Sequence, residues 1–296
     1  MSTVTNNHND GRSGRADLAG LVIPDIDVAV VGVCAARTRT APSARTRTPW
    51  TAMEDYAALV RARTPIRPLR LPLTTGAPRE VADRIAGLPH RVSAAFVTGL
   101  GWADSLTVQR AVAERGGPLV ITETDLLTVT LAASTITTLR HRRVPPRTGR
   151  VVIAGVNPAP LLAPVLMASG VGNLSSWHER DAQALPLRRV MEHHDVLIDL
   201  GGSADDQVAP SRTVRPPDDP FTDGALVLPG LLSAVCGHGA LGLTVDVIAA
   251  CVRALALITP VDRVLPALDD RLLVSAVARH AGRTLGDSVP LRDRQQ

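Results

Sequence analysis

Short apolar runs alternate with amphipathic segments along most of the chain. Runs such as residues 28–34, 94–100 and 195–202 are apolar on both faces, whereas segments such as 79–88 repeat their apolar positions with a helical period. Strands that are apolar on both faces are typical of parallel sheets covered by helices. The alternation therefore predicts an α/β fold with a doubly wound parallel sheet.

Changes in composition suggest where the chain divides. Residues 1–18 are polar, and we expect them to form a disordered arm. We then predict a smaller α/β domain at 19–127 and a Rossmann-like domain at 128–296. Residues 203–224 are rich in Pro and Asp and are interpreted as a loop. Residues 37–50 contain Arg-Thr-Arg-Thr twice and are typical of an exposed loop, although a phosphate-binding loop remains the alternative.

Local signals specify several helices in more detail. Thr51 followed by Glu54 matches a capping box, so a helix is predicted over 51–63. The segment 126–142 carries many β-branched residues, and we expect a long helix buried on several sides. A strand at 151–156 leads into a helical segment that Pro164 should kink.

Composition and charge narrow the possible functions. All 32 basic residues are arginine, so no step can use a lysine amine. The net charge of +4 comes from the first 80 residues and lacks interleaved aromatics, which argues against nucleic-acid binding. No apolar run is long enough to span a bilayer, no signal peptide is evident, and we expect a cytoplasmic protein without a membrane partner. The three cysteines are scattered and predict no structural zinc.

From about residue 53 to 285 the order of segments resembles the malic enzymes, which oxidatively decarboxylate malate with NAD or NADP and a divalent metal, Mg²⁺ or Mn²⁺. The segments that carry the resemblance are PLVITETDLLTVTLAA, GRVVIAGVNPAPLLAPVLMASGV, GALVLPGLLSAVCGHG and DDRLLVSAVARHAG. The resemblance implies that the N-terminal α/β domain is truncated, because a family stretch containing Tyr-Thr-Pro-Gly is missing.

The resemblance places catalytic groups at positions that have changed. The family's general base is a lysine in a Met-Glu-Gly-Lys type of stretch, and the matching stretch here is Met53-Glu54-Asp55-Tyr56. Tyr56 occupies the place of the lysine and is also the only tyrosine of the chain. General acid–base catalysis needs a titratable group at the substrate, so Tyr56 is the candidate catalytic residue.

The metal ligands implied by the resemblance are also incomplete. The family's Glu-Asp pair aligns with Ala103-Asp104, and its later Asp falls near Thr124. Asp104 is thus the only ligand kept in place. A shift of one residue would recruit Glu123 or Asp125, which leaves a weakened site for a hard cation as a possibility.

The dinucleotide loop has lost its glycines. The three fingerprint positions hold Ala154, Val156 and Ala159, and Gly155 is the only glycine of the turn. The branched side chain of Val156 fills the space that a pyrophosphate would enter. Asn157 can cap the following helix, but the prolines at 158 and 160 remove N–H donors that would hold phosphate.

Two further residues complete the candidate cofactor site. Glu179 could reach a ribose hydroxyl at the end of the second strand, next to His178 in the aligned position. Gly201 follows the strand 195–202 where a parallel strand meets the ligand crevice, and it permits either close ligand approach or a turn. The family's paired substrate-binding asparagines align with Asp223-Gly224, where a carboxylate would repel a dicarboxylate.

Two other polar clusters carry weaker signals. Glu192-His193-His194-Asp195 is typical of charges at a helix C-terminus rather than of a metal site. Cys236 and His238 are interpreted as packing and turn residues rather than as a nucleophile pair.

These observations predict a malic-enzyme-like scaffold that has lost malate oxidative decarboxylation and has a non-catalytic or repurposed role. The alternative is a divergent NAD(P)-dependent oxidoreductase or decarboxylase acting on a malate-like 2-hydroxy acid, built on Tyr56, Asp104 and either Glu123 or Asp125. Apolar helices around the Pro-Gly segment favour a homodimer, and an unknown protein partner is the further expectation.

Overall fold

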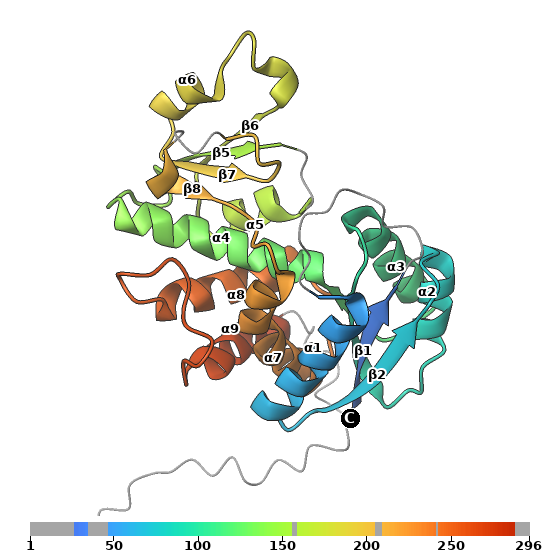
Figure 1. The fold of residues 1–296 in the computed structure, drawn as a ribbon. Coiled ribbons are helices and arrows are strands. Elements are labelled where there is room, and N and C mark those ends of the chain that lie inside the picture. The colour runs from blue at the N-terminus through green and yellow to red at the C-terminus, as the bar shows by residue number, and fades with distance from the viewer. Residues whose placement is uncertain (1–26, 35–46, 156–158, 205–208, 241, 288–296) are drawn as a thin grey trace, which may run out of the picture.

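The computed structural model describes residues 27–34, 47–155, 159–204, 209–240 and 242–287. They form two parallel four-stranded sheets with helices around and between them, which confirms the predicted α/β class (Figure 1). The arm predicted at residues 1–18 lies outside the described residues, as does most of the Arg-Thr repeat segment.

The first sheet has the strand order β2-β1-β3-β4. Its central strand β1 is buried at six of its seven residues because both faces are covered by helices. The strands are β1 (Asp27–Val33), β2 (Arg67–Leu73), β3 (Val92–Thr98) and β4 (Leu119–Thr122), and the helices are α1 (Pro49–Arg63), α2 (Pro78–Ala86) and α3 (Trp102–Glu114).

The second sheet repeats this topology with the order β6-β5-β7-β8. Its order reverses between β5 and β7, and a ligand crevice is expected at such a switch point. The strands are β5 (Arg150–Ala154), β6 (Asn173–Trp177), β7 (Val196–Asp199) and β8 (Thr213–Val214). The helical elements are α5 (Leu162–Ala168), α6 (Leu187–Glu192) and the 3-10 helices Glu179–Asp181 and Pro210–Arg212.

Four long helices form a layer beside and between the sheets (Figure 1). They are α4 (Glu123–His141), α7 (Pro220–His238), α8 (Val245–Ile258) and α9 (Leu273–Asp287). Helix α4 is buried at thirteen of its nineteen residues, as expected from its β-branched composition. The predicted domain boundary at 127–128 falls inside this helix. Helix α7 is apolar and long enough to cross a membrane, but 67% of its most apolar window is buried in the protein, which is typical of a core helix.

Three local predictions need correction. Helix α1 begins before Thr51, because Thr48 is its N-cap and accepts a hydrogen bond from the Thr51 backbone N–H at 3.1 Å. Pro49 suits the first turn, where its missing N–H has no helical partner. The predicted loop at 203–224 contains β8 and the start of α7.

The third correction concerns Pro164. Helix α5 begins only at Leu162, so Pro164 lies in its first turn. A first-turn residue needs no backbone N–H donor, so the proline is accommodated without kinking the helix.

Candidate functional site

The candidate site lies at the carboxyl ends of the first sheet's strands, where α1, α4 and α7 meet. Tyr56 comes from α1 and is fully buried. Its ring lies 4.5 Å from that of Phe96 and 4.8 Å from that of Phe221, between centroids. Its hydroxyl donates to the carbonyl of Pro220 at 3.3 Å. Tyr56, the catalytic residue predicted from the sequence, therefore packs between β3 and the start of α7.

The electrostatic surroundings of Tyr56 oppose its ionisation. Burial raises the pKa of Tyr56 far above its ordinary value, and the carboxylates of Glu123 and Asp219 raise that pKa further. A phenol in this environment stays neutral at physiological pH. It can donate a hydrogen bond, but it supplies no base of the kind that a deprotonated lysine would provide.

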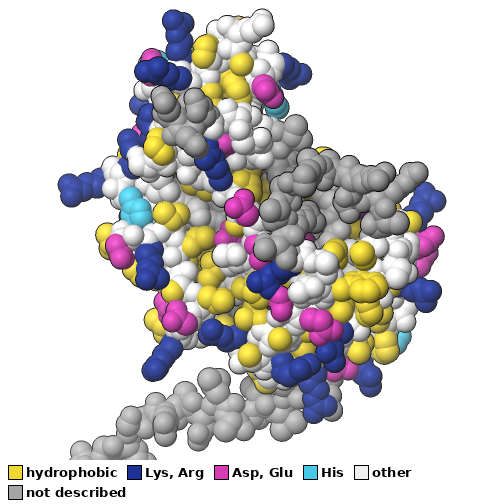
Figure 2. All heavy atoms as spheres, viewed as in Figure 1, with side chains coloured by type: hydrophobic (Ala, Val, Ile, Leu, Met, Phe, Trp, Pro, Cys, Tyr) yellow, Lys and Arg dark blue, Asp and Glu magenta, His cyan; other side chains and the backbone are white. Residues whose placement is uncertain are grey.

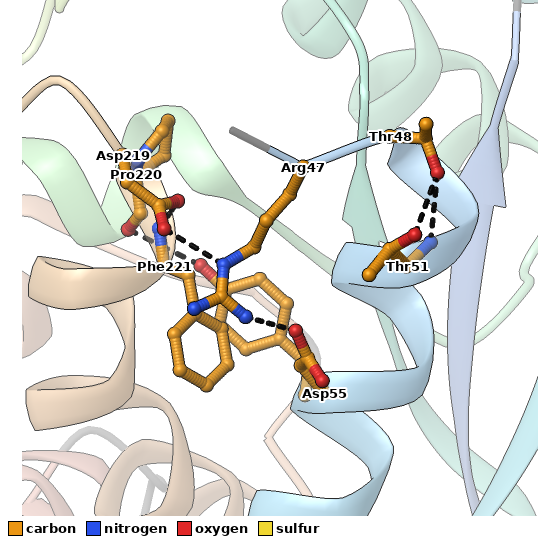
Figure 3. Close-up of polar contacts among 8 residues, drawn as sticks. Arg47, Thr48, Thr51, Asp55, Asp219, Pro220 and Phe221 are labelled. Carbon is orange, nitrogen blue, oxygen red and sulfur yellow. Dashed lines mark hydrogen bonds and ion pairs between the residues drawn. The ribbon is translucent and has the colours of Figure 1, made fainter. Parts of the chain in front are cut away.

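Arg47 also lies in this site, and it was not among the site residues predicted from the sequence. Its Nε lies 2.7 Å from Oδ2 of Asp219, and its Nη1 pairs with the carboxylate of Asp55. The guanidinium also lies 4.3 Å above the ring of Phe221 (Figure 3). Arg47 thus links the segment before α1 to α7, with its charge shared between two carboxylates and an aromatic face.

Asp219 has a second role at this contact. Its Oδ1 accepts the backbone N–H of Phe221 at 3.1 Å, which makes it the N-cap of α7, and Pro220 follows at the first helical position. The sequence signal for this arrangement was present, because Asp before Pro at the start of an apolar run is typical of a helix N-terminus. No local sequence pattern indicates the ion pair between Asp219 and Arg47, because the two residues are 172 positions apart.

The cavity between these elements is very small. Its volume of about 20 Å³ has room for about one water molecule. It is lined by the following residues: Arg47, Pro49, Ala52, Thr98, Gly99, Glu123, Asp219 and Pro220. A malate-sized dicarboxylate does not fit this space, because the chain's own side chains fill it.

The three carboxylates predicted as metal ligands have separate environments. Asp104 is exposed in the first turn of α3. A carboxylate oxygen of Glu123 accepts the backbone N–H of Gly99 at 3.0 Å. Within the described residues, no group of three His, Cys, Asp or Glu side chains is arranged to hold a metal ion.

Asp125, the third of these carboxylates, caps helix α4. One of its oxygens accepts hydrogen bonds from the backbone N–H and the hydroxyl of Thr122 at 2.8 and 2.9 Å, and from the side-chain amide of Gln109 at 2.8 Å. Burial raises the pKa of Asp125 to about 6, although these hydrogen bonds favour the charged form. The carboxylate of Asp125 therefore forms part of the capping box at the start of α4 and does not converge with the other two carboxylates on a metal site.

Asp223, at the aligned position of a substrate asparagine, lies partly buried in the first turn of α7. Burial raises its pKa, and a hydrogen bond with Thr130 opposes that rise. The adjacent Gly224 is required by Tyr56, because a Cβ at this position would lie 2.3 Å from the phenol oxygen. The Asp-Gly pair is therefore explained by packing against α1 and α4.

The candidate cofactor loop lies at the carboxyl end of the second sheet. Gly155 has a φ of +95°, and a Cβ added to it would lie 2.7 Å from the backbone nitrogen of Gly201. The loops after β5 and β7 are thus in backbone contact at the switch point, where a dinucleotide would be expected. Val156 and Asn157 lie outside the described residues.

The loop after β7 is held in place by Asp199. Its side chain is fully buried, and its oxygens accept the backbone N–H groups of Ser203 at 2.9 Å and Ala204 at 3.2 Å. Arg215 pairs with the same carboxylate at 3.1 Å. A buried carboxylate needs such partners, and they fix the loop that carries Gly201.

Glu179 lies at the same edge of the second sheet, in the 3-10 helix that follows β6. It is exposed to solvent. The preceding strand end is anchored by Trp177, whose indole nitrogen donates to the carbonyl of Leu185 at 2.8 Å. Gly155, Glu179 and Gly201 therefore lie at the same edge of the second sheet, after β5, β6 and β7. The backbones of the two glycines are in contact with each other.

The remaining polar clusters have structural partners. The imidazole of His194 contacts the hydroxyl of Ser175 at 2.9 Å and the carbonyl of Val190 at 2.7 Å. The ring of His238 contacts the carbonyl of Ala234 at 2.9 Å. Burial raises the pKa of the Cys236 thiol to about 11, so it is not a ready nucleophile.

Solved structures share this fold at low sequence identity. An NAD-dependent malic enzyme from Thermotoga maritima is 14% identical, with a TM-score of 0.67 over 88% of this chain and 85% of that one. A malic enzyme from Entamoeba histolytica is 13% identical, with a TM-score of 0.68 over 90% and 70% of the two chains. No protein-family model and no curated protein sequence matches the chain. The likeness establishes a malic-enzyme-like fold.

Proposed function

We propose that this chain is a malic-enzyme-like scaffold that has lost malate oxidative decarboxylation and serves a non-catalytic or repurposed role. The observation that carries the proposal is the filled site at the end of the first sheet. Arg47, Tyr56 and Asp219 occupy it, and the remaining cavity of about 20 Å³ has room for about one water.

The loss of the base supports the same conclusion. No lysine exists anywhere in the chain, and the tyrosine in the aligned position is buried, with a strongly raised pKa. Proton abstraction from a hydroxyl group requires a base that is unprotonated near the working pH. Tyr56 does not meet this requirement.

The described residues also fit the family's cofactors poorly. The Thermotoga maritima neighbour is an NAD-dependent enzyme, and a dinucleotide site needs a glycine-rich loop whose backbone is free to approach the pyrophosphate. Here the backbone of Gly155 already contacts that of Gly201. A divalent metal needs several convergent oxygens, whereas Asp104 is exposed and Asp125 caps α4.

One observation favours the alternative of a divergent NAD(P)-dependent oxidoreductase or decarboxylase. Glu123, Asp219 and Asp223 all lie close enough to Tyr56 to raise its pKa, so several ionisable groups remain at the end of the first sheet. In that alternative, Tyr56→Phe and Asp104→Asn abolish turnover of a malate-like acid while the fold is retained. Turnover unchanged in both variants would reject these assignments.

The deciding experiment is calorimetric titration of the full chain with NAD⁺, NADH, NADP⁺ and NADPH, each with and without Mn²⁺. The NAD-dependent Thermotoga maritima enzyme serves as the positive control under the same conditions. The scaffold proposal expects no heat of binding up to millimolar ligand. Micromolar binding of any of the four would overturn it and would direct attention to malate-like substrates.

A further inference from the structure

An open pocket lies along helix α3, on the side that faces away from the first sheet. Its volume is about 500 Å³, which is within the range of ligand pockets in proteins. Its lining includes Arg79 of α2 together with Trp102, Leu106 and Arg110 of α3. Figure 1 shows α2 and α3 at the edge of the molecule, away from the second sheet. We call it the α3 pocket, and it shares no lining residue with the candidate site.

The helical period of α3 separates the protein core from this pocket. Val108 and Val112 are fully buried and pack in one core cluster with Val81 and Ile85 of α2. The residues at 103, 107, 110 and 114 repeat with the same period on the opposite side of α3, and they line the pocket. The buried stripe holds α2 and α3 together, so the pocket is formed before a ligand arrives. Such preorganisation lowers the entropic cost of binding.

Trp102 gives the pocket an exposed aromatic wall. Of the three tryptophans in the chain, Trp177 lies in a core, whereas Trp102 is 41% exposed at the first position of α3. Leu106 lines the same pocket one turn later. Tryptophan is enriched among the residues that dominate binding energy at protein interfaces. An aromatic ring of a ligand is a suitable partner for the indole, because aromatic pairs gain more than their buried area alone provides.

Two arginines of the pocket lack a counter-ion. The side chains of Arg79 and Arg110 form no ion pair or hydrogen bond within the described part of the chain. Arg79 lies in the first turn of α2, where a positive charge opposes the helix dipole. Arg115 differs, because it pairs with Asp83 at 2.9 Å. The charges of Arg79 and Arg110 therefore remain available to a negatively charged ligand.

The shape and the remaining charges of the pocket favour a peptide over other anionic ligands. The lining extends from Trp102 to Arg115, about 20 Å of helix, which matches about six residues of extended peptide. Glu114 also lines the pocket and would repel the phosphates of a nucleic acid. Figure 2 shows acidic side chains beside basic ones at the edge where α2 and α3 lie in Figure 1. A nucleic acid or an anionic membrane would need a more uniformly basic surface.

The pocket also offers a hydrogen-bond acceptor to a peptide backbone. The hydroxyl of Thr107 donates to the carbonyl of Ala103 at 3.0 Å. Its oxygen can still accept a bond from an N–H group of a ligand, because a hydroxyl has two acceptor lone pairs.

We propose that the α3 pocket is a docking site for an acidic segment of a partner protein that carries an aromatic residue. The aromatic ring packs against Trp102 and Leu106, and carboxylates on either side of it pair with Arg79 and Arg110. The proposal goes beyond the loss of malate chemistry, because the pocket lies outside the candidate site. Its test is therefore independent of the titration with NAD(P).

A selection from random peptides tests the class of ligand. The full chain is immobilised and exposed to a phage-displayed library of random peptides of about seven residues, enough to cover the pocket. The expected consensus has Asp or Glu on both sides of Phe, Tyr or Trp. A consensus without acidic residues, or no enrichment over the support without protein, would contradict the proposal.

Substitutions then test where the consensus peptide binds, with fluorescence anisotropy of the labelled peptide as the measurement. Trp102→Ala, and the double variant Arg79→Glu with Arg110→Glu, should each raise the Kd at least about tenfold. The affinity of the wild type should also weaken with added salt.

Matched variants control for nonspecific effects of these changes. Trp50→Ala removes a tryptophan that is 44% exposed in the first turn of α1. Arg188→Glu with Arg189→Glu reverses two exposed charges on α6. Both controls should keep the Kd within about twofold of the wild type, and circular dichroism should show the same folded signal for all of these proteins.

A labelled single-stranded oligothymidylate tests the competing class of ligand. It should not bind at concentrations that saturate the peptide. Oligothymidylate binding that Arg79→Glu with Arg110→Glu abolishes would assign the pocket to nucleic acid and overturn the proposal. A consensus peptide that binds the wild type, the Trp102 variant and the charge-reversed variant equally well would also overturn it, because such a peptide binds elsewhere.

Discussion

The carboxyl edges of the two sheets have the same topology but are filled in different ways. At the first edge, side chains from distant segments meet, with Arg47 joining Asp55 to Asp219 above Phe221. At the second edge, two loops meet through their backbones at Gly155 and Gly201. Salt weakens an ion pair between side chains, whereas the close approach of two glycine backbones does not depend on salt and leaves no room for an added Cβ. The second edge should therefore tolerate change less well.

The largest effect is expected at Gly155. Substitution with alanine meets the Gly201 backbone at 2.7 Å and also strains a φ of +95°, so the free energy of unfolding should fall by about 3 to 5 kcal/mol. Gly202→Ala is the control, because its φ is also positive at +67° but a Cβ there would meet nothing within 4 Å. That control should cost only about 1 kcal/mol. Equal losses in urea unfolding would show that the backbone contact contributes nothing.

Asp199→Ala is expected to have the next largest effect. It leaves the N–H groups of Ser203 and Ala204 without their carboxylate acceptor. It also removes the ion pair of Arg215, which still donates to the carbonyl of Ala204 at 2.8 Å. The cost should be about 2 to 3 kcal/mol, below that of a fully buried pair because Arg215 is 43% exposed. Asp195→Ala, just before the same strand, removes one bond to Arg150 N at 2.9 Å and should cost about 1 kcal/mol. Thermal unfolding of both variants measures the difference.

The first edge should show a pH dependence that comes from Asp125. Burial raises its pKa in the folded protein to about 6, above the value near 3.9 of an unfolded chain. Between these values the folded state binds the extra proton, so the contribution of Asp125 to stability is present below pH 4 and is lost as the pH rises through 6.

Asp125→Asn isolates this contribution. Relative to the variant, the wild type should lose about 2 kcal/mol of unfolding free energy between pH 4 and pH 7, because its folded state releases the stabilising proton over this range. Urea denaturation at several pH values checks it. A difference that does not vary with pH would place the pKa of Asp125 close to its ordinary value.

The smallest effect is expected from the Arg47–Asp219 pair. Both side chains are partly exposed, at 33% and 20%, so a double-mutant cycle to alanine should give a coupling of about 1 kcal/mol that weakens with added salt. The exposed pair of Arg70 and Glu54 is the matched control, with an expected coupling below about 0.5 kcal/mol. If the two couplings are equal, the contact with Phe221 adds nothing to the pair.

Much of the fold could be predicted from local patterns. The alternation of buried strands and helices, the parallel sheets and the buried helix α4 all follow from periodicity within each segment. The errors lie at element ends, where Thr48 rather than Thr51 caps α1 and α5 begins only at Leu162. Such boundaries depend on which of several competing caps packs better against its neighbours.

The sequence by itself determined that no lysine amine is available and that the dinucleotide fingerprint has only Gly155 in its turn. Only the tertiary structure decided that Tyr56 packs between Phe96 and Phe221 and that Arg47 meets an aspartate 172 positions away. The physical reason is the separation along the chain over which each property is decided. Residue types and helical or strand periods are local properties, whereas contacts between distant side chains depend on how complete layers of helices and sheets pack against each other.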